Sequence, residues 1–130
     1  MILVDSSVWI EYLRNSDHPV NATLRGLLTR GADIRITEPI IMELLAGADT
    51  ANRETAISKL TNGLSLIPID PAVDYRAAAA IFAAAARVGK RIRSLNDCLI
   101  AAIAIRSQAE LLHKDRDFEE IAKVAALIEH

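Results

Sequence analysis

The sequence predicts an α/β fold of three layers, with a central, mainly parallel sheet of four or five strands flanked by helices. Short apolar runs alternate with longer segments of helical periodicity, which is typical of chains that form parallel sheets. The chain has 130 residues, 52% hydrophobic and 25% charged, which suits a folded domain with its own core. No repeat, low-complexity tract or linker interrupts it, so we expect residues 1–130 to form one domain.

Short apolar runs are expected to form the strands. The run at the start of the chain has no basic segment before it and no cleavage site after it, so we expect the first strand there and not a signal peptide. The last run would extend the sheet from four strands to five. In chain order the runs are Ile2–Val4, Ile34–Thr37, Ser65–Ile67, Glu110–His113 and Ala126–Ile128.

Longer periodic segments between these runs are expected to form helices. They are Ser7–Arg14, Val20–Arg30, Pro39–Ala46, Asn52–Asn62, Pro71–Val88, Asn96–Ser107 and Phe118–Lys123. Asp70 stands before Pro71, which predicts a capping side chain followed by proline at the first helical position. The spacing of Ser94 and Asp97 fits a capping box at the start of a later helix. That helix contains the all-apolar stretch Leu99–Ile105, so we expect it to be buried although Asp97 lies in its first turn.

Composition and charge exclude several classes of protein. The only cysteine, Cys98, cannot form an intramolecular disulfide or a zinc site built from thiolates. No apolar run approaches the roughly 18 residues that span a bilayer, so we expect a cytoplasmic protein without a membrane partner. The net charge is −2. A protein with this charge that binds nucleic acid needs a local basic patch, or metal ions that supply the positive charge.

Four carboxylates stand at positions that could converge. Asp5 follows the first strand, and Asp115 follows the strand at Glu110–His113. Ligands of open parallel sheets bind beyond the carboxyl ends of the strands. Asp97 opens the buried helix, and Glu43 lies within an apolar helical segment. If these side chains meet, their oxygens would suit a hard cation such as Mg²⁺ or Mn²⁺.

Each acid also has a structural interpretation. Asp5 could cap the helix that follows it, and Asp97 could belong to a capping box. Glu43 lies opposite the apolar residues of its helix, which favours exposure to solvent. Asp117, with Glu120 three residues later, has the spacing of a capping box, so a capping role is favoured for it over metal binding. Asp115 lies in a charged turn that could simply be solvated.

Four segments resemble the four acidic blocks of PIN-domain proteins. They are VDSSVWIEYL, TEPIIMELLAG, SLNDCLIAAIA and LLHKDRDF, and together they extend from Val4 to Phe118. Their order and spacing are most similar to the toxin nucleases of VapBC toxin–antitoxin modules. The resemblance implies a PIN-like fold in which Asp5, Glu43, Asp97 and Asp115 are the acids of a metal site. It also implies an auxiliary role for Asp117. Ser7 is the hydroxyl residue that often follows the first aspartate, and Ser6 stands where the family often has threonine.

The resemblance implies a Mg²⁺- or Mn²⁺-dependent endoribonuclease that hydrolyses RNA with a metal-activated water and leaves a 5′-phosphate. It further implies the toxin of a type II system that inhibits translation, a cognate antitoxin that covers the site, and a homodimer formed through the early helices. Two alternatives remain open: an RNA-processing PIN nuclease without an antitoxin, and a non-catalytic PIN-like binding module. A haloacid-dehalogenase-type phosphatase is disfavoured, because it needs D-x-D after the first strand and this chain has DSS.

Other residues bear on catalysis and on substrate. His18, His113 and His130 are poorly placed for a mechanism with two histidines. A basic cluster directly before Asp97 could contact RNA phosphates, or it could be a solvated loop; its members are Arg87, Lys90, Arg91 and Arg93. We expect Ser7, Arg91 and Arg93 to contact substrate. Trp9 and Tyr12 fall in the first helix, so we expect them in the core or an interface and see no aromatic platform for stacking RNA bases.

Overall fold

The computed structural model describes residues 1–130 and has a parallel sheet of five strands. The strands are β1 (Ile2–Val4), β2 (Ile34–Ile36), β3 (Ser65–Leu66), β4 (Glu110–Leu112) and β5 (Ile128–Glu129). Their order in the sheet is β3-β2-β1-β4-β5, and every neighbouring pair is parallel. This confirms the predicted α/β fold and its fifth strand. β1 is the central strand, so the chain moves outward from it on one side and then on the other.

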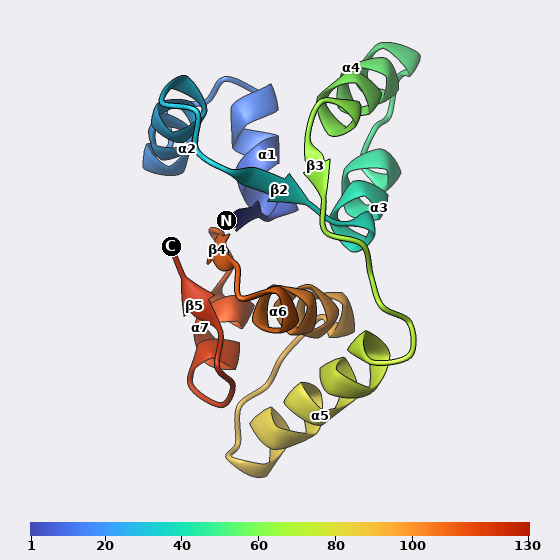
Figure 1. Ribbon diagram of the computed structural model, residues 1–130, viewed down its shortest axis with the longest axis vertical. Helices are drawn as coiled ribbons and strands as arrows, with labels where there is room; N and C mark the ends of the chain where they lie inside the picture. Colours follow the sequence, from blue (N-terminus) through green and yellow to red (C-terminus); the bar gives the residue numbers. More distant parts are fainter.

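Helices cover both faces of this sheet. They are α1 (Ser6–Leu13), α2 (Pro19–Thr29), α3 (Glu38–Ala46), α4 (Ala51–Asn62), α5 (Asp74–Arg87), α6 (Leu95–Ser107) and α7 (Arg116–Ala122). Figure 1 shows α1–α4 on one side of the sheet and α5–α7 on the other. This division follows from right-handed crossovers that leave the central strand in opposite directions. None of the helices is long and apolar enough to cross a membrane.

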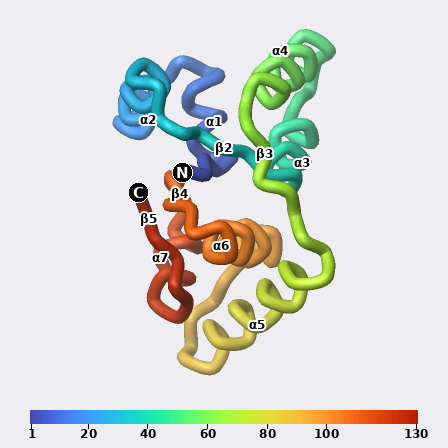
Figure 2. The backbone as a smooth tube through the Cα atoms, viewed as in Figure 1, coloured from blue at the N-terminus to red at the C-terminus, as the bar shows by residue number.

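The buried helix α6 was predicted correctly. Every residue from Cys98 to Ala104 is buried. Figure 2 shows α6 between the sheet and α5. The residues of α5 that face it include the small side chains Ala78 and Ala85, which are also buried. Trp9 is fully buried and packs edge-to-face on Tyr12, so it belongs to the core and offers no surface to a partner.

Most differences from the predicted boundaries are small. Five helices begin one residue earlier than expected, because the residue before each start takes the capping position. β5 begins later than the predicted Ala126–Ile128. The N–H groups of Val124 and Ala125 bond to the carbonyl of Ile121, so the end of α7 continues as a turn before the chain reaches β5.

The start of α5 was predicted incorrectly. Asp70 does not cap a helix that begins at Pro71, because Oδ1 of Asp70 accepts from the N–H of Ala72 and closes a local turn. The helix begins only at Asp74, whose Oδ2 accepts from the N–H of Asp70 at 2.7 Å. Asp74 is thereby drawn into the interior, where its side chain is fully buried.

The start of α7 was also predicted incorrectly. Asp115, and not Asp117, is the N-cap: its Oδ1 accepts from the N–H of Asp117 at 2.9 Å. Glu120 does not complete a capping box, because its carboxylate pairs with Lys90 and Lys123. The carboxylate of Asp117 is therefore released from the capping role that its spacing suggested.

Candidate metal centre

The acidic side chains meet at the carboxyl edge of the sheet, next to the central strand. The strand order reverses between β1 and β4, and such switch points are where open α/β sheets bind ligands. Carboxylate oxygens of Asp5, Glu43 and Asp97 lie within 4.8 Å of one another. Asp97, Asp115 and Asp117 form a second group with the same spacing. Because Asp97 belongs to both groups, the structure joins all five acids singled out by the sequence into one cluster.

Asp5 serves as a helix cap and still presents an oxygen to the cluster. Its Oδ2 accepts from the N–H of Ser7 at 3.0 Å and from the Ser7 hydroxyl at 2.6 Å. Its Oδ1 is buried and has no hydrogen-bond partner within the protein. A buried carboxylate oxygen without a partner is costly, so this atom fits a cation ligand. The capping and site interpretations of Asp5 are therefore compatible.

Glu43 does not point into open solvent as its helical face suggested. It is half-buried, because α3 packs against both α1 and α6 and leaves little of its surface free. The hydroxyl of Ser6 donates to Oε1 of Glu43 at 3.3 Å. The pKa of Glu43 is raised above its ordinary value, mainly because the carboxyl is partly buried and secondly because the charge of Asp5 repels it. The sequence showed only that Ser6 replaces a threonine, and not that it holds this carboxylate.

Asp97 is the shared member of the cluster and the most strongly perturbed. Burial raises its pKa to about 8, and the charges of Asp115, Asp5 and Glu43 add to the rise. Its N–H donates to the hydroxyl of Ser94 at 3.3 Å, which fixes the first turn of α6 beneath the acids. Burial and the neighbouring charges therefore favour the protonated form of this carboxyl in the metal-free protein.

The two acids of the β4–α7 segment, Asp115 and Asp117, are each held in place by a hydrogen bond to another residue. Nδ1 of His113 accepts from the N–H of Asp115 at 3.2 Å, and its Nε2 bonds to Glu129 at 2.7 Å. Asp117 is buried, and its Oδ2 accepts from the N–H of Arg93 at 3.0 Å. His113 thus supports the loop that carries Asp115, a role that the sequence did not indicate.

Ser7 links the two loops that bear the aspartates. Its hydroxyl donates to Asp5 and accepts from the N–H of Lys114 at 3.2 Å. Lys114 in turn pairs with Glu11 on α1 at 3.0 Å. These contacts place Ser7 beside the cluster and give it a positioning role for Asp5.

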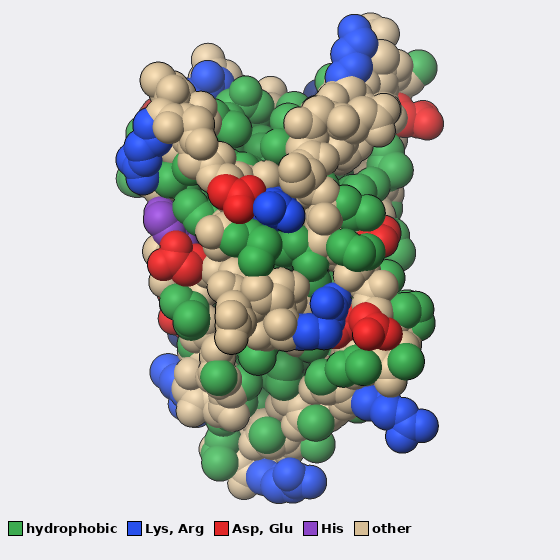
Figure 3. All heavy atoms as spheres, viewed as in Figure 1, with side chains coloured by type: hydrophobic (Ala, Val, Ile, Leu, Met, Phe, Trp, Pro, Cys, Tyr) green, Lys and Arg blue, Asp and Glu red, His purple; other side chains and the backbone are tan.

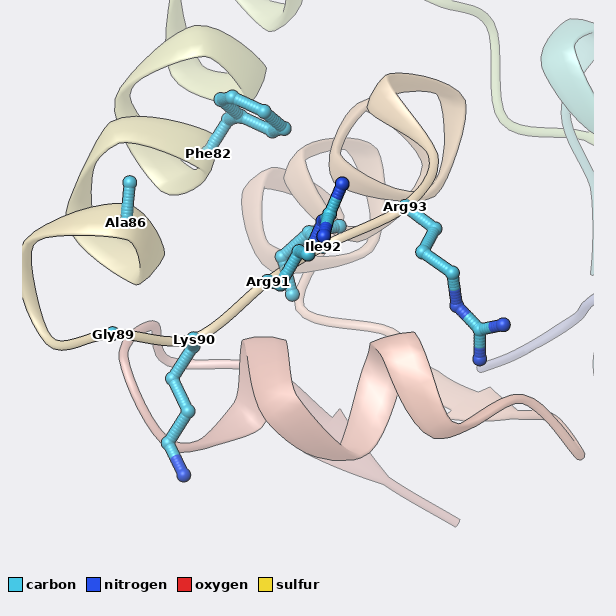
Figure 4. Close-up of a pocket in the computed structure, with 7 residues that line it drawn as sticks. All are labelled: Phe82, Ala86, Gly89, Lys90, Arg91, Ile92 and Arg93. Carbon is cyan, nitrogen blue, oxygen red and sulfur yellow. The ribbon is translucent and has the colours of Figure 1, made fainter.

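The basic residues expected to contact substrate lie on the segment before α6. Arg93 is next to the cluster, with its Nε 4.0 Å from Oδ1 of Asp117 and its side chain 77% exposed. Figure 4 shows this side chain reaching toward the start of α7, while Lys90 points away toward the end of that helix. Arg91 is exposed and lies between them in the chain.

The ligand set fits a hard divalent cation. Every candidate ligand is a carboxylate oxygen, and no cysteine or histidine belongs to either group. Mg²⁺ and Mn²⁺ prefer such oxygens, whereas zinc sites are built mainly from sulfur and nitrogen. Several buried carboxylates also repel one another unless positive charge is supplied.

Known proteins share both the sequence and the fold of this chain. A family model described as PIN domain matches residues 2–124. The chain is 47% identical over 128 residues to a VapC ribonuclease of Mycobacterium bovis and to Ribonuclease VapC11 of Mycobacterium tuberculosis; the match covers 98% of this chain and 96% of each relative.

Solved structures with the same fold include FitAcB from Neisseria gonorrhoeae, with a TM-score of 0.73 and 25% identity over 100% of this chain and 97% of that one. VapBC2 from Rickettsia felis, bound to a promoter DNA fragment, has a TM-score of 0.77 and 18% identity over 100% of this chain and 98% of that one. The chain therefore belongs to the PIN-domain family and, within it, to the VapC ribonucleases.

Proposed function

We propose that this chain is a metal-dependent endoribonuclease in which Asp5, Asp97 and Asp115 bind Mg²⁺ or Mn²⁺. Glu43 would bind directly or through water, and Asp117 would be auxiliary. The observation that carries the proposal is the convergence of these carboxylates around the unpartnered Oδ1 of Asp5. A divalent cation held there lowers the pKa of bound water and neutralises charge on the phosphate.

The protein's own part in the reaction is to hold its acids in place before the RNA arrives. The helix caps fix Asp5 and Asp115, and Ser7 ties their loops together. Arg93, beside Asp117, would contact a phosphate close to the cleaved bond. Such fixed geometry is worth more than the same groups in a mobile loop, since no reorganisation is needed at the moment of reaction.

Cleavage of total RNA with and without EDTA tests this function. We expect cleavage with Mg²⁺ or Mn²⁺, no cleavage with excess EDTA, and recovery when the metal is added back. Mapped product ends should carry 5′-phosphates. Calorimetric titration of the metal separates the alternatives. If Mn²⁺ binds without RNA cleavage, or if no metal binds, the chain is a binding module and the proposal is wrong.

We further propose that an antitoxin covers the site and that this nuclease acts as a toxin by cleaving RNA needed for translation. A groove of ≈ 400 Å³ lies between α1, α3 and α4, with Glu43 on its wall. Figure 3 shows hydrophobic side chains in the hollow between the α1–α2 and α3–α4 halves. Its apolar residues include Ile10, Leu13, Leu44 and Ile57. An apolar helix would fit this groove, and a cationic side chain at its end could reach the acids.

Leu13→Glu tests the antitoxin proposal, because Leu13 is 40% exposed in the groove and outside the acidic cluster. The partner in the assay would be a short protein encoded next to this gene. We expect the variant to bind the antitoxin at least about 10-fold more weakly, a loss of about 1.4 kcal/mol, because the new charge would face the apolar helix of the antitoxin. RNA cleavage by the free variant should not change. Tyr75→Glu, 57% exposed on α5, is the control. Equal affinity of both variants would contradict the assignment, and the absence of any such partner would favour an RNA-processing nuclease.

The homodimer implied by the family resemblance stays a prediction, which the molar mass of the isolated chain in solution would test. The buried Trp9 cannot contribute to it.

A further inference from the structure

A second pocket lies beside the acidic cluster, between the end of α5 and the segment that leads into α6. It has a volume of ≈ 520 Å³. Phe82 and Ala86 line it from α5, and the loop Gly89–Arg93 lines it from the other side. Three of its side chains are cationic and none is acidic. Its chemistry therefore favours an anion that also carries an apolar surface.

The charges at this pocket are not equally available. Lys90 pairs with Glu120 at 3.1 Å. Arg91 forms no ion pair with any carboxylate. The only ion pair of Arg93 is with Asp117, whose Oδ1 lies 4.0 Å from Nε of Arg93. Two guanidinium groups thus remain to neutralise a bound phosphate, and arginine is well suited to that task because its planar group can donate two parallel hydrogen bonds.

Phe82 supplies an aromatic surface that the sequence did not reveal. Its side chain is 39% exposed. Figure 4 shows its ring on the loop-facing side of α5, above Arg91 and Ile92. Bases of single-stranded RNA stack on aromatic rings and on guanidinium planes. Phe82 was not considered as a stacking residue from the sequence, because it is distant in sequence from every acidic block.

The pocket is held in shape by the backbone that forms it. Gly89 has a φ of +74°, a left-handed conformation that favours glycine, and it turns the chain out of α5. Ile92 is buried and anchors the middle of the loop. The N–H of Arg93 bonds to Asp117, a member of the acidic cluster. The same residue thus lines the pocket and touches the candidate metal centre.

We propose that this pocket binds one nucleotide of the RNA strand next to the cleaved bond, with its base on Phe82 and its phosphate between Arg91 and Arg93. The inference rests on the proposed nuclease function and adds a subsite for one nucleotide beside the acidic cluster. A base can reach Phe82 only when it is unpaired, so the strand is single-stranded at this point. The pocket would therefore select loops and other unpaired regions over duplex RNA.

Steady-state cleavage of a single-stranded RNA that contains the mapped site tests the proposal with Phe82→Leu and Arg91→Gln. Phe82→Leu keeps an apolar side chain but removes the stacking surface, so we expect KM to rise about 10-fold with little change in kcat. Arg91→Gln should raise KM and reduce the slope of log affinity against log salt by about 0.7, the loss of one phosphate contact. Tyr75→Leu and Arg76→Gln, which remove an exposed aromatic ring and an exposed arginine of α5 outside the pocket, should match the wild type.

The outcomes separate this inference from the function on which it rests. If the wild type cleaves RNA and both pocket variants match it in KM and salt dependence, the nucleotide pocket is wrong while the nuclease stands. If the variants change only the molar mass in solution, the pocket is a contact between copies and the inference also fails. If the wild type does not cleave RNA at all, the nuclease proposal fails first. Thermal melting of each variant checks that the partly exposed Phe82 can be replaced without unfolding.

Discussion

Replacing Asp97 with asparagine is expected to reduce RNA cleavage by about a thousandfold and to stabilise the metal-free protein. The first effect follows from the loss of a charged ligand shared by both acidic groups, since the contribution of a bound metal to the transition state amounts to several kcal/mol. The second follows from burial and from repulsion by the neighbouring acids, which raise the pKa of Asp97 to about 8. Asparagine removes the charge that the metal-free site does not tolerate.

The effect of Asp97 on the stability of the metal-free protein should depend on pH. The folded state binds the Asp97 proton more tightly than the unfolded chain, whose ordinary pKa is 3.8. The stability of the metal-free wild type should therefore fall as pH rises from about 4 to about 8 and then level off. The asparagine side chain of the variant has no proton to lose in this range, so the stability of the variant should be flatter. At pH 8 we expect the variant to be more stable by on the order of 2 kcal/mol, allowing for solvent screening.

Urea denaturation between pH 4 and pH 9, with EDTA and then with excess Mn²⁺, measures the second effect, and RNA cleavage measures the first. Mn²⁺ should remove the difference or reverse it, because only the wild type keeps the full ligand set. Asp17→Asn, at an exposed carboxylate outside the cluster, is the control and should change neither property. Wild-type cleavage by Asp97→Asn, or stability of the metal-free wild type that rises with pH over this interval, would contradict the assignment.

Replacing Asp74 with alanine is expected to cost about 3 kcal/mol of unfolding free energy, although this residue is unrelated to the metal centre. Its carboxylate is fully buried and accepts from Nε and Nη2 of Arg106 at 2.8 and 2.9 Å. Burial alone would raise its pKa, but the bonds from Arg106 and Asp70 hold the pKa below its ordinary value. Nη2 of Arg106 also donates to the carbonyl of Pro68 at 2.9 Å. The pair therefore joins α5, α6 and the segment that follows β3.

Loss of Asp74 would leave the guanidinium of Arg106 with a single carbonyl partner and the N–H of Asp70 with none. We expect Tm to fall by roughly 10 °C, measured by calorimetry in EDTA so that metal binding does not contribute. Asp49→Ala is a matched control, because its ion pair with Arg53 is about two-thirds exposed on both sides and should be worth less than about 1 kcal/mol. Replacing Asp74 and Arg106 together by leucine should recover part of the loss. A cost for Asp74→Ala no larger than that of the control would show that the buried pair is not a structural tie.

The sequence was a good guide where a signal is local or periodic. The strands follow from short apolar runs, and α6 follows from an apolar stretch with no polar face. The position of Asp97 at the start of that helix already conflicted with burial, and the structure shows the reason in the acids around it. Asp5 could be placed because the carboxyl end of a central parallel strand is a general ligand position.

The remaining features depend on contacts between distant segments. Asp115 and Asp117 have equivalent capping potential, and only the contact of Asp117 with Arg93 distinguishes them. A helical wheel treats α3 as a surface helix, whereas packing on two sides half-buries Glu43. Phe82 lies in an alanine-rich helix with no acidic motif, so nothing in the sequence links it to the basic loop that it faces. These are effects of tertiary structure that no window of sequence contains.

The capping roles of Asp5 and Asp115 have an evolutionary consequence. Asparagine caps a helix about as well as aspartate does, so either residue could be exchanged for it with the helix start intact. Aspartate and asparagine codons differ by one nucleotide. A lineage could therefore abolish the charge at either position in a single mutational step and keep a folded, partner-binding protein. The same geometry that prepares these acids for chemistry gives the fold a short path to a descendant that has none.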